Sequence, residues 1–373
     1  MLNKGLIFKA GSIFLVMKKI VIGMSGGVDS SVAALLLKKQ GYQVIGVFMK
    51  NYSETKNKFT GECHWIEERA MAKKIAAILE TPLITIDHEK EYKKDVVDKM
   101  FSDYTKGLTP NPDILCNKII KFPFLWKKAK ELKADYIATG HYARIRKKSG
   151  KYLLLKGKDK QKDQSYFLHT LSQKDLSHTI FPVGDLTKDE TRKIAKKNKF
   201  PNWDKKGTSG ICFIGKTDMK RFLMEKIEKH EGKVLSPEGR LIGIHPGISY
   251  FTIGERFKDK LIRINSDYRK KMTGRWYVAE KKNNNLIIAP EEHESLKKTE
   301  VRIRKAHFIS GIEKGRMKAR IRHLGELKNG KLSNKADRWI FEFDKGVEGV
   351  AEGQSIVFYK GDVVIGGGEI RLN

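Results

Sequence analysis

Cysteine is scarce in this chain of 373 residues, which has only Cys63, Cys116 and Cys212. No two of them form a C-x-x-C pair, and their spacing cannot gather four zinc ligands, so no structural metal site is expected. A small, odd number also argues against a secreted disulfide scaffold. It indicates a reducing compartment in which a retained thiol can react, and we therefore expect a cytoplasmic protein.

Long hydrophobic runs are also missing. No apolar stretch reaches the roughly eighteen residues that a membrane helix needs, so we expect a soluble protein without membrane contacts. Residues 1–16 faintly resemble a signal peptide, with an early lysine and an apolar stretch, but no A-x-A cleavage pattern follows. We interpret 1–16 as an N-terminal extension from a start-site assignment and expect a strand to begin at Met17. A weak secretory signal is the alternative.

Acidic residues are few relative to basic ones. Lys and Arg total 75 against 44 Asp and Glu, which gives a formal net charge of +31. The excess is spread over most of the length and exceeds what solubility requires, so a large polyanion is the natural partner. On charge alone, a lysine-rich surface that reflects genome composition remains an alternative.

The hydrophobic content of 40% fits two or three folded domains. From Lys18, an apolar strand, a glycine turn, an amphipathic helix and a second apolar strand form a βαβ unit, which predicts a parallel sheet. From about Glu300, alternating runs such as VRIRKAHF, MKARIRHL and WIFEFD predict antiparallel strands. We expect an α/β fold with an open parallel-sheet domain over 17–225, a small central domain over 226–295 and a C-terminal β-barrel over 296–373.

The pattern within the first domain predicts where a ligand binds. Helices are expected over 64–80, around 92–104 and over 117–132, with strands over 82–88 and 134–141. Ligands of open parallel sheets bind beyond the carboxyl ends of the strands. The turn after the first strand and the segment ATGHY both follow strands, so we expect these two segments to meet.

The most specific local motif is GMSGGVDSSV, which connects an apolar strand to a helix. Gly26 and Gly27 allow the backbone to approach a phosphate, the helix amides favour an anion, and Ser25 and Ser30 offer hydroxyl donors. Asp29 could hold Mg²⁺ beside the phosphates. Because no lysine follows the glycines and G-x-G-x-x-G is missing, the motif is neither a P-loop nor a dinucleotide fingerprint. It predicts a pyrophosphate cradle.

The S-G-G-x-D-S pattern resembles the PP-loop of the ATP pyrophosphatases with an adenine-nucleotide α-hydrolase-like fold. These enzymes cleave ATP between the α and β phosphates and adenylate an oxygen of their substrate. The resemblance implies ATP with Mg²⁺ as the cofactor, and it assigns ATP contacts to Gly23, Met24, Ser25, Gly26, Gly27, Val28, Asp29 and Ser30.

Several further blocks occur in one order: TPNPDILCNKIIKF, ATGHYAR, DQSYFL, SGICFIG, GIHPGISYFTIGER, GQSIVFY and GGGEI. Together with the nucleotide loop they resemble the bacterial and mitochondrial tRNA-specific 2-thiouridylases over nearly the whole chain from Met17. The resemblance implies ATP-dependent 2-thiolation of the wobble uridine of tRNA, through adenylation of the C2 oxygen and transfer of sulfur from a cysteine persulfide. It implies tRNA as substrate and a cysteine desulfurase or sulfur-relay protein as donor; we expect a monomer.

Cys116 and Cys212 lie in segments rich in glycine, proline or asparagine, where we expect exposed thiols close to lysines that favour the thiolate. From the residues alone, each could equally be a small buried hydrophobe. The resemblance implies that Cys212 carries the persulfide. It implies that Cys116 is the catalytic partner, which either attacks that persulfide and leaves a disulfide or otherwise assists transfer. Asp113 resembles the family residue at the target base, as acid or base; capping the next helix is the alternative.

The resemblance also assigns contacts outside the loop. Met49 and Gly140 resemble positions that contact the adenosine of ATP, and Cys63 receives no catalytic role. His141 could instead be a structural histidine. Contacts with tRNA are assigned to Asn111, Pro112, Asp113, His141, Lys162, Asp163, Gln164 and, in the C-terminal strands, Arg322, His323 and Gln354.

Two blocks depart from the family pattern. GTSGICF stands where D-S-T-G-I-C-F is common, and GERFKDKL replaces a loop of the G-Q-R-K-G-L-G type. Two other hypotheses therefore remain: an enzyme that directs a nitrogen nucleophile to the adenylate, although no N-terminal glutaminase signature is visible, and a tRNA-binding module without catalysis. The intact SGGVDS loop and both cysteines favour the sulfurtransferase.

Overall fold

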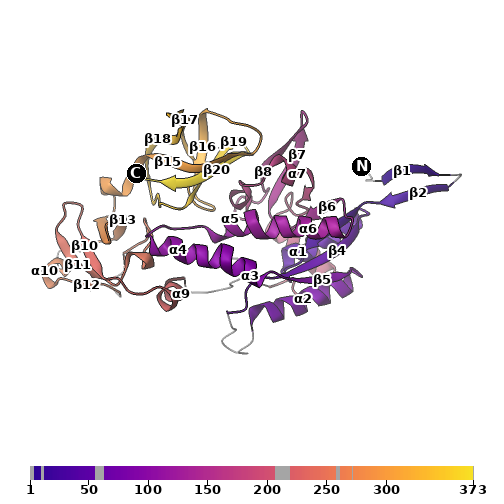
Figure 1. Cartoon of the computed structure of the whole chain (residues 1–373), viewed down its shortest axis with the longest axis horizontal. Coiled ribbons are helices and arrows are strands. Elements are labelled where there is room, and N and C mark those ends of the chain that lie inside the picture. The colour runs from indigo at the N-terminus through magenta and orange to yellow at the C-terminus, as the bar shows by residue number, and fades with distance from the viewer. Residues whose placement is uncertain are drawn as a thin grey trace. The chain divides into compact units, whose positions relative to one another are not determined.

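The computed structural model describes residues 4–9, 12–54, 63–205, 219–257, 261–270 and 272–372, and Figure 1 traces the chain. The predicted persulfide carrier Cys212 and its altered flank lie outside these residues. The chain forms two compact units. The first contains Met1–Val96, Asp113–Lys216 and Gly361–Ile365, and the second contains Val97–Pro112, Thr217–Lys360 and Gly366–Asn373.

The first unit is built on a five-stranded parallel sheet. Its strand order is β5-β4-β3-β6-β9, and every pairing is parallel. The strands are β3 (Lys19–Gly23), β4 (Gln43–Lys50), β5 (Leu83–Asp87), β6 (Tyr136–Ala138) and β9 (Thr179–Ile180). Ile20, Val21 and Ile22 are fully buried, as expected for a strand covered on both faces. The predicted open parallel sheet is confirmed, and its order reverses beside β3.

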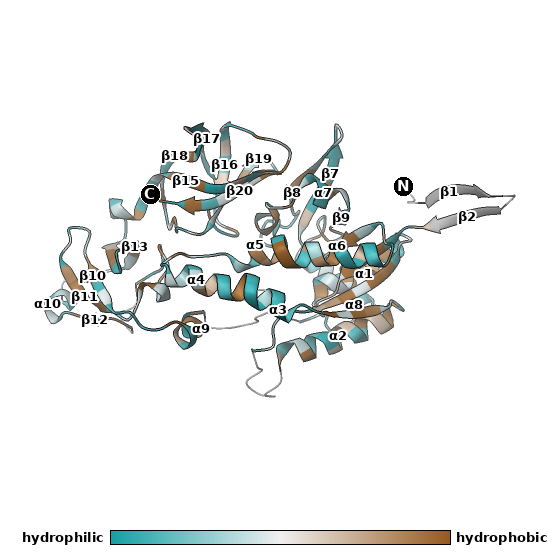
Figure 2. Cartoon of the chain, viewed as in Figure 1, coloured by the Kyte–Doolittle hydropathy of each residue, from teal (hydrophilic) through white to brown (hydrophobic). Residues whose placement is uncertain are grey.

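The predicted helices are all present, two of them interrupted, and the structure adds further helices that the sequence analysis did not predict. The longer ones are α1 (Val28–Lys39), α2 (His64–Ile78), α6 (Phe122–Glu131) and α8 (Lys188–Lys197), with the short α3 (Glu89–Tyr92), α5 (Pro112–Cys116) and α7 (Gln173–Ser177). Figure 2 shows apolar residues along α1 and the strands beside it. Two expected single helices are interrupted by π-helical turns: Lys93–Asp98 precedes α4 (Lys99–Thr105), which belongs to the second unit, and Asn117–Lys121 precedes α6. Such turns loosen the regular i→i+4 ladder and are frequent at functional sites.

Two hairpins complete the first unit. β7 (Ala143–Lys148) pairs with β8 (Lys151–Lys156), and Val363 pairs with Leu155 of β8. Ahead of the sheet, β1 (Lys4–Lys9) pairs with β2 (Ser12–Met17). Met17 therefore ends a strand, where the sequence had suggested that it begins one.

The second unit contains two β structures. The smaller has strand order β12-β11-β10-β14-β13. Its strands are β10 (Gly232–Leu235), β11 (Leu241–His245), β12 (Arg263–Ile264), β13 (Trp276–Lys282) and β14 (Asn285–Pro290), accompanied by the helices α9 (Met219–Lys226) and α10 (Ser266–Arg269).

The larger is an antiparallel barrel. Strands follow the order β15-β18-β17-β16-β19-β20, and pairing of β15 with β20 closes the ring. They are β15 (Lys297–Phe308), β16 (Gly315–Arg320), β17 (Lys328–Lys335), β18 (Arg338–Glu348), β19 (Ser355–Lys360) and β20 (Val363–Arg371). Phe341 stacks on Phe358 in its interior. The predicted C-terminal β-barrel is confirmed. Among the described residues, no helix combines the length and apolar character needed to cross a membrane.

Candidate functional site: a nucleotide cavity at the edge of the parallel sheet

The glycine-serine loop after β3 is held by its own side chains. The Ser25 amide donates to the Ser30 hydroxyl at 3.2 Å, and that hydroxyl donates to the Gly27 carbonyl at 3.0 Å. Gly26 has φ +72, and a Cβ at this position would lie 2.3 Å from the Glu68 carbonyl oxygen. No side chain caps α1 at Gly27. The first amides of a twelve-residue helix therefore face a preformed loop, which is the arrangement that binds phosphate.

A cavity of about 210 Å³ opens at this loop, beyond the carboxyl ends of β3, β4 and β6. This is where an open parallel sheet binds ligands, next to the reversal of strand order. Of the residues predicted to contact ATP, those that line the cavity are Gly23, Met24, Ser25, Gly27, Val28, Asp29, Ser30, Met49 and Gly140. Gly26 is not among the lining residues, because it packs against α2.

The predicted meeting of the loop with the ATGHY segment is confirmed. Thr139, Gly140 and His141 line the same cavity. A Cβ on Gly140 would lie 2.7 Å from the Ser30 amide nitrogen, closer than real contacts allow. Glycine is therefore required here because the backbone after β6 lies directly against the start of α1.

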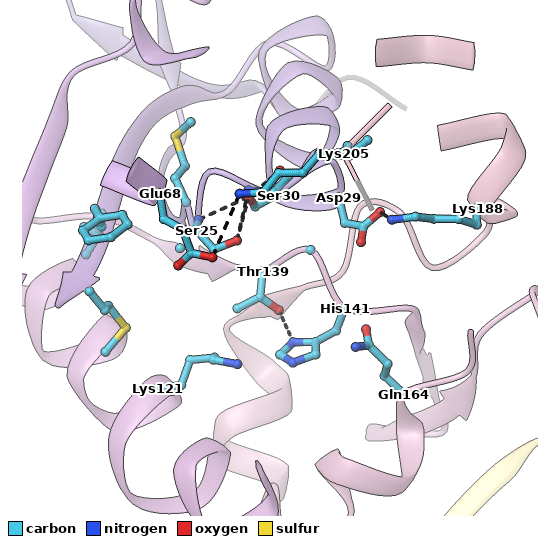
Figure 3. A pocket seen from close by; sticks show the side chains of 18 residues that line it. Ser25, Asp29, Ser30, Glu68, Lys121, Thr139, His141, Gln164, Lys188 and Lys205 are labelled. Carbon is cyan, nitrogen blue, oxygen red and sulfur yellow. Dashed lines mark hydrogen bonds and ion pairs between the residues drawn. The ribbon is translucent and has the colours of Figure 1, made fainter. Parts of the chain in front are cut away.

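Asp29 is the centre of a polar network that reaches two further elements. Its Oδ1 accepts a hydrogen bond from the Tyr142 hydroxyl at 2.8 Å and an ion-paired hydrogen bond from Lys188 Nζ at 2.6 Å, which Figure 3 shows pointing at the carboxylate. Burial and the charge of Asp29 raise the pKa of Tyr142, so its hydroxyl remains a neutral donor. Lys188 is the first residue of α8, after the Thr187 capping box.

Three lysines and two carboxylates are the charged groups among the residues that line the cavity. Lys121, Lys188 and Lys205 contribute the positive charge, against Asp29 and Glu68. Burial raises the pKa of Glu68, whose carboxylate lies 4.0 Å from Lys205 Nζ. A surplus of positive charge beside uncapped helix amides suits a polyphosphate. Sequence reasoning missed Glu68 and all three lysines.

His141 lies inside this cavity as a buried residue. Its Nδ1 is 2.7 Å from the Thr139 hydroxyl oxygen, and its ring stacks on Phe122 with centroids 5.9 Å apart. Burial, followed by the positive charge of Lys121, holds the pKa of His141 well below its usual value, so the ring stays neutral at pH 7. The histidine therefore lines the cavity as a buried, neutral side chain, and its contact with tRNA stays a prediction.

The three residues of the KDQ segment, Lys162, Asp163 and Gln164, have different environments. Gln164 lines the cavity, and its Oε1 accepts from the Tyr142 amide at 3.0 Å. Lys162 is exposed. Asp163 is only 1% exposed, and its Oδ1 accepts from the amides of Gly157 and Ser165, both at 3.1 Å. Asp163 is thus held by nearby backbone amides, and its predicted contact with tRNA stays a prediction.

Cys116 differs from its expected setting. It is 1% exposed and ends α5, where helix continues directly into the π-helical turn. The expectation of an exposed thiol in a turn is wrong for this conformation, because the asparagine and proline around it lie in continuous helix. Asp113 lies in the first turn of α5, where the helix dipole stabilises a carboxylate. Cys63 precedes α2, and its thiol donates to the Ser53 carbonyl at 3.0 Å.

The remaining predicted tRNA residues belong to the second unit. Asn111 Nδ2 donates to Gln354 Oε1 at 3.5 Å, so these two sequence-distant residues are neighbours. Arg322 is exposed, and it follows β16, which ends at Arg320. Arg322 and His323 therefore lie outside the strands, in a turn that contains Leu324 at φ 56, and Gln354 lies just before β19; the prediction that the three lie in strands is wrong.

The fold and the cavity define a class of protein. A parallel sheet whose first strand leads through a serine-glycine loop to an uncapped helix, with the cavity at the reversal of strand order, is an ATP-using domain of the adenine-nucleotide α-hydrolase (HUP) type. The model of the "tRNA methyl transferase HUP domain" matches residues 18–216. Models of the "tRNA methyl transferase PRC-barrel domain" and the "Aminomethyltransferase beta-barrel domain" match 220–290 and 298–370.

Comparison with curated proteins identifies the family within that class. The chain is 43% identical to tRNA-specific 2-thiouridylase MnmA 1 of Geobacillus kaustophilus, over 94% of each chain. It is 41% identical to MnmA 2 of Aliarcobacter butzleri, over 95% of this chain and 98% of the relative, and 43% identical to MnmA of Buchnera aphidicola, over 95% and 97%. The chain belongs to the tRNA-specific 2-thiouridylase family, whose members are sulfurtransferases that use ATP.

Proposed function

We propose that the chain thiolates C2 of the wobble uridine of tRNA, through adenylation of the C2 oxygen and transfer of sulfur from a cysteine persulfide. The observation that carries this proposal is the cavity: a phosphate-binding loop at the carboxyl edge of the sheet, in a chain of this family. The cavity supports ATP as the activating substrate, and the family supports tRNA as the acceptor.

The activation step uses the groups around the loop. The uridine C2 oxygen attacks the α-phosphorus of ATP, and pyrophosphate leaves. Loop and helix amides bind the phosphates, while Lys121, Lys188 and Lys205 neutralise negative charge. Met49 and Gly140 border the adenosine. The neutral ring of His141, held by the Thr139 hydroxyl, lies in the cavity without adding a positive charge.

Mg²⁺ would be held by Asp29 together with phosphate oxygens. One carboxylate plus substrate phosphates is a common way for proteins to bind this ion. Among the described residues, no cluster of three His, Cys, Asp or Glu side chains could hold a metal alone. When bound, the ion would offset the negative charge of the leaving pyrophosphate.

The sulfur step uses the two cysteines. In this proposal the Cys116 thiolate attacks Sγ of the Cys212 persulfide, hydrosulfide is released to C2 of the adenylated uridine, and AMP leaves with the original oxygen. The two cysteines are left as a disulfide, which a thiol reductant returns to two thiols with two electrons. Alternatively, Cys116 assists direct transfer from Cys212. Asp113, at the start of the helical segment that carries Cys116, would act as acid or base at the target uridine.

Recognition of tRNA would involve both units. In the proposed contact set, Asp113, His141, Lys162, Asp163 and Gln164 come from the first unit, and Asn111, Pro112, Arg322, His323 and Gln354 from the second. The proposed domains are a catalytic domain over 17–225, a central tRNA-binding domain over 226–295 and the barrel over 296–373, preceded by an N-terminal extension over 1–16. We further propose a cytoplasmic monomer that receives sulfur from a cysteine desulfurase or relay protein.

The three cysteines allow a matched test. Cys116→Ser and Cys212→Ser should each abolish 2-thiouridine formation while ATP binding is retained, because neither thiol is part of the phosphate-binding loop. Cys63→Ser, which removes a half-buried thiol outside the proposed chemistry, should retain activity. Thiolation by either of the first two variants would refute the mechanism, and loss of activity in all three would point to a structural effect.

A further inference from the structure

The short segment between α4 and α5 leads directly into the residues proposed for catalysis. At its start, α4 ends in two capping hydrogen bonds: the Gly107 amide donates to the Tyr104 carbonyl at 2.9 Å, and the Leu108 amide donates to the Asp103 carbonyl at 3.0 Å. Gly107 has φ +76, as a left-handed helix end requires. The segment therefore leaves α4 in one defined direction.

The smaller β structure of the second unit contacts the segment next. Lys281, in β13, donates from Nζ to the Gly107 carbonyl at 3.1 Å. The partly buried Lys281 side chain loses hydration, which lowers its pKa to about 8. The hydrogen bond to the Gly107 carbonyl replaces part of the hydration that the Lys281 ammonium has lost.

The barrel holds the same segment two residues later. The Thr109 amide donates to the Glu352 carbonyl at 2.8 Å, and Thr109 is only 5% exposed. A Cβ on Gly353, where φ is +87, would lie 2.9 Å from Leu108 Cβ and 3.0 Å from the Thr109 nitrogen. The backbone of this turn thus lies directly against the segment, and Asn111 reaches Gln354 just beyond it.

The turn Glu352–Gln354 is itself fixed to the barrel. The Gly353 amide donates to the Ile370 carbonyl at 3.0 Å, and the Ile370 amide donates to the Gln354 carbonyl at 2.7 Å. Arg371 pairs with the Glu352 carboxylate at 3.3 Å. Because two backbone hydrogen bonds join the turn to β20, we expect a displacement of the turn to displace Thr109 as well.

We propose that Gly353 and Lys281 are positioning residues for the sulfur-transfer reaction. By holding Gly107 and Thr109 from two sides, they fix the stretch of chain that leads into α5, the helix that carries Asp113 and Cys116. Only three residues lie between Thr109 and Asp113, so little chain is available to absorb a displacement at Thr109. The inference rests on the proposed function and adds that the tRNA-binding barrel controls the catalytic segment through this turn.

The test compares two glycines of the barrel in the full-length protein. Gly353→Ala combines left-handed strain with the clash at Thr109, whereas Gly315→Ala, at φ +102 with no atom within 4 Å, has the strain alone. Single-turnover thiolation is measured at saturating tRNA with ATP, Mg²⁺ and a persulfide donor, beside tRNA affinity and the thermal unfolding midpoint. We expect the thiolation rate of Gly353→Ala to fall by about 10- to 100-fold, the loss typical of misplaced catalytic groups.

Because tRNA is saturating, weaker tRNA binding cannot account for a lower rate of Gly353→Ala, and Gly315→Ala should thiolate at the wild-type rate. A wild-type rate in folded Gly353→Ala would overturn the proposal. So would a loss confined to tRNA affinity, because the turn would then only dock RNA. If the wild-type protein itself forms no 2-thiouridine, the proposed function fails, which is a different result from equal rates in wild type and variant.

A second variant removes the contact that Lys281 makes with the segment and introduces no strain at a glycine. Lys281→Met removes the hydrogen bond to Gly107 while keeping an apolar stem. We expect a rate loss of about tenfold at saturating tRNA. If Gly353→Ala does not fold, this variant decides: an unchanged rate overturns the proposal, and a loss in rate alone supports it.

Discussion

The carboxylate of Asp29 lies 2.6 Å from the ammonium of Lys188, although 159 positions separate the two residues in the sequence. The pair joins the start of α1 to the start of α8 at the edge of the nucleotide cavity. A lysine at this place neutralises the one acidic residue of the phosphate-binding loop. It therefore lets the loop keep an aspartate without repelling a polyphosphate.

Replacing Lys188 should weaken ATP binding. In Lys188→Met the Asp29 carboxylate loses its ion pair, and the cavity loses one of three lysines, so the dissociation constant for ATP should rise about tenfold, as for a charge-assisted contact. Calorimetry with ATP measures this. Lys193→Met, at an exposed position of the same helix, is the control and should bind as wild type. Equal affinity in Lys188→Met would show that Lys188 has no part in nucleotide binding.

The burial of Cys116 predicts slow alkylation. In the folded protein, iodoacetamide should modify Cys63 faster than Cys116, because Cys116 is 1% exposed whereas Cys63 is half-buried. Mass analysis of the cysteine peptides over time gives both rates. In guanidinium the difference should disappear, since unfolding exposes both thiols. Equal rates in the folded protein would contradict the position of Cys116 in α5.

Acidification should destabilise the protein. Burial is the main cause that lowers the pKa of His88, His141, His178 and His245. Below the ordinary histidine pKa of 6.5, these histidines bind protons in the unfolded chain but stay neutral in the folded chain. The free energy of unfolding therefore falls as pH falls. Each such histidine costs up to about 1.4 kcal/mol per pH unit in this range. The raised pKa of Glu68 acts in the opposite direction, but it is one group against four.

Unfolding midpoints at about pH 7.5 and about pH 5.5 test this sign. The midpoint should drop at the lower pH, and the drop should be smaller in His141→Gln. His230→Gln, at an exposed position, should keep the wild-type drop. A midpoint that is constant or rises on acidification would contradict the buried, neutral histidines.

The exposed turn after β16 predicts a salt effect on tRNA binding. If Arg322 meets a phosphate, Arg322→Ala should reduce the slope of log K against log salt by about 0.7 to 0.9, the counterion released by one contact. Arg316→Ala is the control, since Arg316 is equally exposed but paired with Asp344. Titrations of tRNA at several salt concentrations give the slopes. Identical slopes for wild type and Arg322→Ala would remove Arg322 from the interface.

The fold and the phosphate-binding loop could be predicted because both depend on local pattern. Unbroken apolar runs such as Ile20–Ile22 indicate buried parallel strands, and a glycine-serine turn between strand and helix indicates an anion site. The meeting of that turn with Gly140 followed from a general property of parallel sheets, namely that their carboxyl ends share one edge.

The rest of the site depends on contacts that no local pattern encodes. Lys188 is one of 75 basic residues, and nothing near it in the sequence marks its partner Asp29. The burial of Cys116 and Asp163 depends on how their segments pack. Proline and asparagine neighbours suggested an exposed turn for Cys116, but proline is well tolerated in the first turn of a helix, which is where Pro112 lies.

The most direct test of the account is nucleoside mass analysis after the purified protein is incubated with ATP, Mg²⁺, unmodified tRNA and a cysteine desulfurase. The account predicts a uridine heavier by the sulfur-for-oxygen difference, formed only with ATP and only when Cys116 and Cys212 are present. Pyrophosphate release without this product would indicate a different nucleophile. Neither pyrophosphate nor thiolated uridine would contradict the account and favour a protein that only binds tRNA.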